Sequence, residues 1–201
     1  MKQSLMLVSL PLLAIIGGCN DQTATTANDT TVVTADENMA VADDLNMTDP
    51  MAGNMTADAG VPMTAQAFAD TAAASDAYEI ESSKLAQDKA QSAELKAFAA
   101  MLVKDHTDST AKLKAAAAEA EPAVTPHPVM NAEQQANMDA LRAASGAAFD
   151  TEYKKQQVAA HQKALTALRG YATGGDVASL KTFASNTAPV VEKHLSEVQG
   201  M

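Results

Sequence analysis

Residues 95–113 read LKAFAAMLVKDHTDSTAKL, and their apolar side chains recur at helical spacing. Leu95, Phe98 and Leu102 are three and four residues apart, and His106 continues the same stripe one turn later. Side chains separated in this way lie on one face of an α-helix. The stretch therefore predicts a long helix that buries an apolar face containing a histidine.

The rest of the second half of the chain repeats this pattern. Alanine, leucine, lysine, glutamine and glutamate dominate it, which favours helix over sheet, and almost no segment alternates with a period of two. We predict an all-α fold: a four-helix bundle with an extra short helix in the crossover between the second and third long helices. The expected long helices span about 64–89, 93–119, 147–171 and 177–198, and the short one spans 131–144.

Local signals mark the ends of these helices. Ser92 is a plausible N-cap, and Asn131-Ala-Glu-Gln134 has the form of a capping box. The Gly174-Gly175-Asp176 sequence is expected to end the third long helix and to cap the fourth. Pro189 falls inside the fourth helix, where it removes a backbone donor and is expected to bend the helix.

The N-terminus has the form of an export signal. Lys2 precedes an apolar run that ends in Ile16-Gly-Gly-Cys19, too short and wrongly flanked for a membrane-spanning helix. This ending looks like the lipobox of bacterial lipoproteins, in which the cysteine is acylated and becomes the first mature residue. We therefore expect residues 1–18 to be a lipoprotein signal peptide. Cys19 would carry palmitate or similar acyl chains and hold the protein to the membrane.

This resemblance also predicts a location. The chain would be anchored in the bacterial cell envelope and face the periplasm, and Asn20 after the cysteine favours the outer membrane over the inner one. Because Cys19 is the single cysteine, no intramolecular disulfide can form in that oxidising compartment.

The charge of the chain excludes some partners. Its 14 basic and 25 acidic side chains give a formal net charge of −11. An acidic surface repels nucleic acid and anionic lipid headgroups, so neither is an expected partner. The sequence predicts no particular protein partner.

Residues 19–63 differ from the rest in composition. They are rich in Thr, Ala, Asp, Asn and Met and nearly lack large branched or aromatic side chains, so we expect a disordered acidic tether. Its methionines could bind Cu(I), which soft thioether ligands favour, but compositional drift explains them more simply because no histidine accompanies them. These methionines are Met39, Met47, Met51, Met55 and Met63.

Three histidines occupy the apolar stripes of three different long helices. His106 follows Leu102, His161 lies between Val158 and Leu165, and His194 follows Val191. We assign no role to the fourth histidine, His127, which lies between two prolines.

The first long helix offers a carboxylate instead of a histidine. Glu81 falls between Tyr78 and Leu85 on the more apolar face, while Glu79 shares a face with small residues. We keep both Glu79 and Glu81 as candidates for a metal site with the three histidines. Imidazole with carboxylate suits Fe, Zn or Cu. The alternative is a buried polar network without metal, which would equally satisfy the buried polar atoms.

The region from about 66 to 199 resembles a family of bacterial secreted ferritin-like domains known as domain of unknown function 4142. The resemblance implies a ferritin-like bundle in an outer-membrane or periplasmic protein, and no established reaction. The matching residues are Glu79-Ile-Glu81, Lys84-Leu-Ala, Lys96-Ala-Phe98-Ala, Asp105-His106, Ser145-Gly-Ala-Ala-Phe149-Asp150, Tyr153, Ala160-His161, Pro189 and Glu192-Lys-His194-Leu195.

The sequence departs from the di-iron pattern of ferritin-like oxidases. That pattern requires a Glu three residues before a His on each of two helices, whereas Val103, Val158 and Val191 stand at those positions here. Valine cannot bind a metal, so we do not expect a di-iron centre.

Two hypotheses for function follow. The first is a lipid-anchored binding or stress-related envelope module with no catalytic site, since no nucleophile elbow or phosphate-binding loop occurs in the sequence. The second is a metal-binding bundle, with redox activity open, that uses one glutamate and three histidines from four helices.

Overall fold

The computed structural model describes residues 63–201, and this part of the chain contains five helices and no strand. The predicted all-α fold class is confirmed. Cys19, the signal peptide and Met39, Met47, Met51 and Met55 lie outside the described residues. The helices are α1 (Ala65–Lys89), α2 (Ala93–Ala118), α3 (Ala132–Ala143), α4 (Gly146–Gly174) and α5 (Ala178–Gln199).

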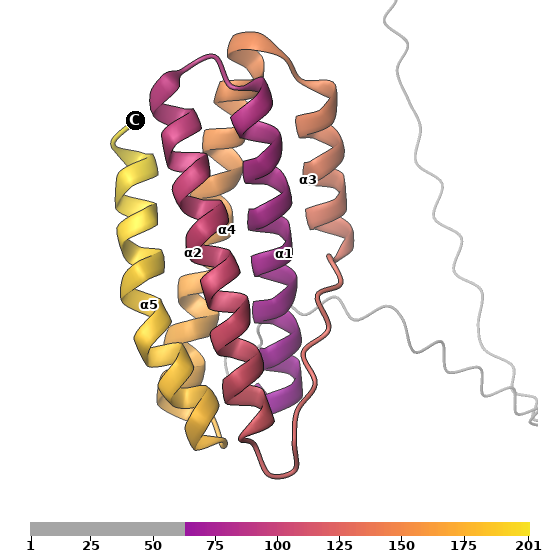
Figure 1. Ribbon diagram of the computed structural model, residues 1–201, viewed down its shortest axis with the longest axis vertical. Helices are drawn as coiled ribbons and strands as arrows, with labels where there is room; N and C mark the ends of the chain where they lie inside the picture. Colours follow the sequence, from indigo (N-terminus) through magenta and orange to yellow (C-terminus); the bar gives the residue numbers. More distant parts are fainter. Residues whose placement is uncertain (1–62) are drawn as a thin grey trace, which may run out of the picture. The chain divides into compact units, whose positions relative to one another are not determined.

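Four long helices run side by side as a bundle, with α3 on the outside (Figure 1). Helix α1 packs mainly along α2, and α4 mainly along α5. Fewer contacts join α2 to α5 and α1 to α4, and these close the bundle. The short helix α3 lies between α2 and α4 in the chain and packs against α1 and α4. Among residues 63–201, no helix is both long and apolar enough to cross a membrane.

The helix starts follow the capping signals in the sequence. The Ser92 hydroxyl accepts a hydrogen bond from the backbone N–H of Leu95 at 3.3 Å. Asn131 and Gln134 form the expected capping box at the start of α3. Each cap satisfies backbone donors that the first helical turn leaves unpaired.

Two acidic residues accept hydrogen bonds near helix ends, and one of them, Asp176, was predicted to act differently. Asp176 does not cap α5: the N-cap position is Val177, and Asp176 accepts a hydrogen bond from the Tyr171 hydroxyl at 2.9 Å. The Asp150 carboxylate accepts the backbone N–H groups of Gln91 and Ser92, at 3.0 and 3.2 Å. It therefore ties the α1–α2 connection to the first turn of α4.

The core consists of two apolar clusters. One contains Phe68, which stacks on Tyr171 with ring centroids 4.1 Å apart, and the other contains Phe149. Along α2, the buried residue before His106 is Leu102 of the second cluster, and the next buried leucine, Leu113, belongs to the first. Helices α4 and α5 show the same change of cluster at their own buried histidines. The histidines therefore lie at the boundary between the two clusters.

Candidate metal centre

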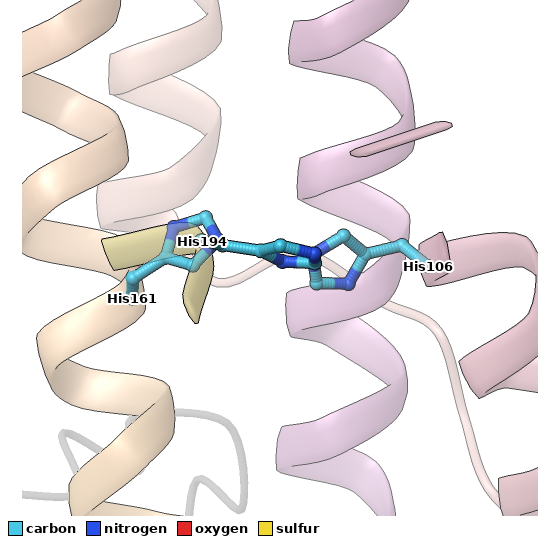
Figure 2. A group of neighbouring side chains, drawn as sticks. All are labelled: His106, His161 and His194. Carbon is cyan, nitrogen blue, oxygen red and sulfur yellow. The ribbon is translucent and has the colours of Figure 1, made fainter. Parts of the chain in front are cut away.

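The three core histidines meet at one point inside the bundle. Their rings project from α2, α4 and α5 toward one another (Figure 2). The ring centroids are 5.9 Å apart for His106 and His161, 5.7 Å for His106 and His194, and 5.5 Å for His161 and His194. All three are buried, with exposed fractions of 5%, 1% and 1% for His106, His161 and His194. We call this group the three-histidine centre.

One nitrogen of each ring is held by an acceptor outside the centre. His106 Nδ1 lies 2.8 Å from Asp76 Oδ1, and His194 Nε2 lies 3.1 Å from Asp105 Oδ2. His161 Nδ1 lies 2.8 Å from the backbone carbonyl oxygen of Gln157. Carboxylate and carbonyl oxygens only accept, so each of these nitrogens carries the proton and donates it. The hydrogen bonds thereby set which nitrogen of each ring is protonated.

The other nitrogen of each ring has no hydrogen-bond partner. These atoms are His106 Nε2, His161 Nε2 and His194 Nδ1, and all three are buried. In a neutral imidazole whose first nitrogen is protonated, the second carries a free lone pair. Leaving a buried polar atom unpaired costs roughly 1–3 kcal/mol. One common partner can satisfy three such atoms when they lie close together.

A metal ion meets that need. One nitrogen from each of His106, His161 and His194 lies within 4.8 Å of the other two. Zinc binds imidazole nitrogen at about 2.0–2.1 Å, which places bound nitrogens at most about 4 Å apart, so a small inward shift of the rings completes the geometry. Histidine ligands whose second nitrogen donates to a carboxylate or carbonyl are the usual arrangement in metal sites. The donor set therefore fits a single transition-metal ion.

The two candidate glutamates are separated by the fold. Glu79 is buried, with an exposed fraction of 1%, and its Oε1 lies 3.8 Å from His161 Nδ1. Glu81 was expected on the more apolar face, and this assignment is wrong. Its side chain is 55% exposed and lies 4.0 Å from the Arg142 guanidinium on α3. Positions 79 and 81 are about 200° apart around a helix, so α1 can turn only one of them into the core.

Glu79 lies beside the three-histidine centre without belonging to the set of converging ligand atoms. Its Oε1 is close to the outer nitrogen of His161, and its Oε2 is buried without a partner. Burial raises the pKa of Glu79 to about 7, although the nearby His106 favours the ionised form. Glu79 can therefore place a negative charge next to the centre or remove it near neutral pH.

The three histidines differ in their tendency to take up a proton. Burial and the proximity of His106 lower the pKa of His161 to about 3. Burial also lowers the pKa of His194, although the hydrogen bond that this ring donates to Asp105 acts in the opposite direction. Burial disfavours the charged form of His106 as well, but its hydrogen bond to Asp76 and the nearby carboxylates outweigh burial and raise its pKa. Two of the three rings, His161 and His194, are thus biased toward the neutral form that binds metal.

Sequence reasoning missed Asp76 as part of this centre. Asp76 is 5% exposed and lies one helical turn before Glu79 on α1. Its position among buried alanines, seven residues after Ala69 and three after Ala73, was the signal that an acidic side chain enters the core. Asp105 was noticed only as part of the matching pattern around His106.

Other singled-out residues lie away from the centre. His127 accompanies Asp70 near the surface, with Nδ1 3.0 Å from Oδ1. Met63, the one tether methionine among the described residues, packs against the apolar cluster that contains Phe68. Helix α5 continues through Pro189, which is exposed.

The di-iron pattern remains absent at the centre. Val191 packs in the core, and Val158 is partly buried against the cluster that contains Phe149. Among residues 63–201, the three histidines form the one group of His, Cys, Asp and Glu ligands that converges closely enough to hold an ion. This group offers three ligands to one ion.

A cavity adjoins the centre on the side of the Phe68 cluster. Its volume is about 50 Å³, and its walls come from all four long helices. His106 and His194 line it together with Asp76 and Asp105, which hold their outer nitrogens. The cavity therefore borders two of the three rings and the carboxylates that hold their outer nitrogens.

Comparison with known proteins identifies the family. The solved structure of CopM in the Cu(II)-bound form is similar in fold, with a TM-score of 0.60 and 19% sequence identity, over 70% of this chain and 96% of that chain. No curated protein matches this chain. The family model described as "Domain of unknown function (DUF4142)" matches residues 50–201. The chain therefore belongs to the DUF4142 family.

Proposed function

We propose that this protein binds a single transition-metal ion through His106, His161 and His194. The observation that carries the proposal is the pairing of each ring: one nitrogen is fixed by an acceptor, and the other points without a partner into a shared buried space. Of the two functions that the sequence left open, this arrangement supports the metal-binding bundle.

Copper is the ion that we expect to bind most tightly. Divalent affinity at nitrogen sites rises along the first transition row to copper and falls again at zinc. The fold is also similar to that of CopM, whose structure is of its Cu(II)-bound form. Zinc and iron are compatible with imidazole ligands and are the alternatives.

We further propose that binding takes place in the cell envelope without turnover. The N-terminal lipobox resemblance would attach the chain through acyl groups on Cys19 and place the bundle in the periplasm. A buried site with three neutral ligands suits holding or sensing a metal there. Glu79 would offset part of the charge of a bound cation.

Metal analysis of the full chain tests the proposal. We expect about one equivalent of copper or zinc in protein purified from the envelope, or after loading and desalting. A variant that combines His106→Ala, His161→Ala and His194→Ala should retain none. His127→Ala is the matched control, because this histidine is exposed and far along the chain from the centre.

The proposal fails on a specific result. If circular dichroism shows equal folding but wild type and the triple variant hold the same amount of metal, the histidines do not bind it. The buried polar network without metal would then be the better interpretation.

A further inference from the structure

A metal held at the three-histidine centre would have a free coordination position. Among residues 63–201, three nitrogens converge, and no carboxylate or fourth histidine joins them within the same short range. Structural zinc sites are closed by four protein ligands, whereas sites with three protein ligands keep the fourth position for an exogenous molecule. The ligand count therefore places this centre in the open class.

The cavity beside the centre is positioned to serve that free position. It touches His106 and His194 directly. A single water needs about 10–15 Å³ of such volume, and the cavity offers about 50 Å³. It can hold a molecule of two or three heavy atoms next to the histidines.

The walls of the cavity favour an uncharged molecule. The sides of Phe68, Leu168 and Phe183 make most of it apolar. The carboxylates on the wall, Asp76 and Asp105, offset the attraction that a bound metal cation would exert on an anion. A small anion would also lose its hydration in an apolar hollow. A small neutral molecule loses little hydration there and is not repelled by the carboxylates.

The cavity also has a way out of the bundle. Thr71 on α1 and Val190 on α5 line it and are exposed, and Ser75 and Ser109 are partly exposed. These residues come from α1, α2 and α5. A small molecule can therefore enter without unpacking the apolar clusters.

We propose that this cavity admits a small uncharged molecule, of two or three heavy atoms, to the free coordination position of the metal at His106, His161 and His194. The inference rests on the proposed metal binding and names the class of ligand that the same site takes. Ala164 is the residue to alter, because it lines the cavity one helical turn after His161.

Carbon monoxide binding to the Cu(I)-loaded full chain tests the inference. Copper content is measured first, and the infrared C–O stretch is then recorded under carbon monoxide. We expect one band with about one equivalent of gas per copper. Ala164→Leu, which fills the cavity, should keep its copper but lose the band or weaken carbon monoxide binding at least tenfold.

Matched variants keep the result interpretable. Ala172→Leu makes the same change in α4 at a partly buried position outside the cavity and should leave the band unchanged. If Ala164→Leu does not fold by circular dichroism, Ala167→Leu, also on the cavity wall, replaces it.

The outcomes separate the two proposals. Bound copper without any C–O band overturns this inference and leaves the proposed function standing. An equal band in wild type and in the filled-cavity variant also overturns it, because the gas would then arrive by another route. Absence of copper in the wild type overturns both.

Discussion

Two groups of buried polar side chains in this bundle differ in whether all of their polar atoms have hydrogen-bond partners. In the first, which we call the Tyr–Gln–Ser layer, the Tyr78 hydroxyl donates to Gln156 Oε1 at 2.7 Å, and Ser83 and Tyr153 share a hydrogen bond of 2.8 Å. None of these four residues has a buried polar side-chain atom without a partner. The three-histidine centre, by contrast, leaves one nitrogen of every ring unpaired.

The two groups differ in how their polar atoms are paired. Burial is shared by both groups, so burial alone is no sign of a site. The two hydrogen bonds of the Tyr–Gln–Ser layer each join α1 to α4. The centre uses half of its hydrogen-bonding capacity to fix the rings and leaves the other half free for a ligand.

The largest expected effect is on stabilisation by metal. At a free metal concentration 100 times the dissociation constant, binding adds about 2.7 kcal/mol, or a rise in Tm of roughly 10 °C for a domain of this size. We expect this rise in wild type and in Tyr153→Phe, and none in His161→Ala. Thermal unfolding with and without copper measures it. An equal rise in His161→Ala would show that the two groups do not differ as described.

The next effect is a pH dependence of the metal-free protein. The folded-state pKa of Glu79, about 7, is above its ordinary value of 4.5. The contribution of the neutral Glu79 carboxyl to the free energy of unfolding is therefore fully present below about pH 4.5. It is lost as pH rises through 7. The charged or titratable groups that face it are Asp76 on α1, His106 on α2 and His161 on α4.

Glu79→Gln removes this titration. Between pH 5 and pH 8, we expect wild type to lose about 2 kcal/mol of unfolding free energy relative to Glu79→Gln. Urea unfolding of chelator-treated protein at both pH values measures the difference. Glu81→Gln, at the exposed neighbouring carboxylate, should lose the same unfolding free energy as wild type between the two pH values. An equal loss in Glu79→Gln would contradict the prediction.

A third effect concerns the acceptors behind the histidines. Asp76→Asn weakens the acceptor that orients His106 and should lower metal affinity about 10–100-fold. Asp70→Asn alters the matching pair at the exposed His127 and should leave affinity unchanged. Competition with a chelator of known affinity measures both. Equal affinities in the two variants would mean that Asp76 does not position the ring.

The smallest effect belongs to the Tyr–Gln–Ser layer. Tyr78→Phe leaves Gln156 Oε1 without its donor and should cost about 1–2 kcal/mol of stability with no change in metal affinity. Tyr171→Phe is the matched control, because its partner Asp176 is exposed and can turn to water. Denaturant unfolding measures the loss of unfolding free energy in each variant. A change in metal affinity for Tyr78→Phe would show that the Tyr–Gln–Ser layer contributes to metal binding.

Much of the fold was predictable because it depends on local patterns. The stripe that runs through Leu95, Phe98 and Leu102 correctly indicated the buried face of α2, and the cap signals at Ser92 and Asn131 correctly indicated helix starts. The prediction that Asp176 caps α5 was wrong, because its carboxylate accepts a hydrogen bond from the Tyr171 hydroxyl. The sequence does not reveal this partner.

By itself the sequence determined that three histidines would share buried faces of three helices, because periodicity fixes the angle of a side chain around its own helix. It did not determine how each helix turns and slides against its neighbours. That choice, made by packing of the whole bundle, put Glu79 inside and Glu81 outside, brought Asp76 and Asp105 behind two of the rings, and left three nitrogens facing one another beside a cavity. The sequence determines which side chains can bind a metal, and the tertiary structure determines that they converge.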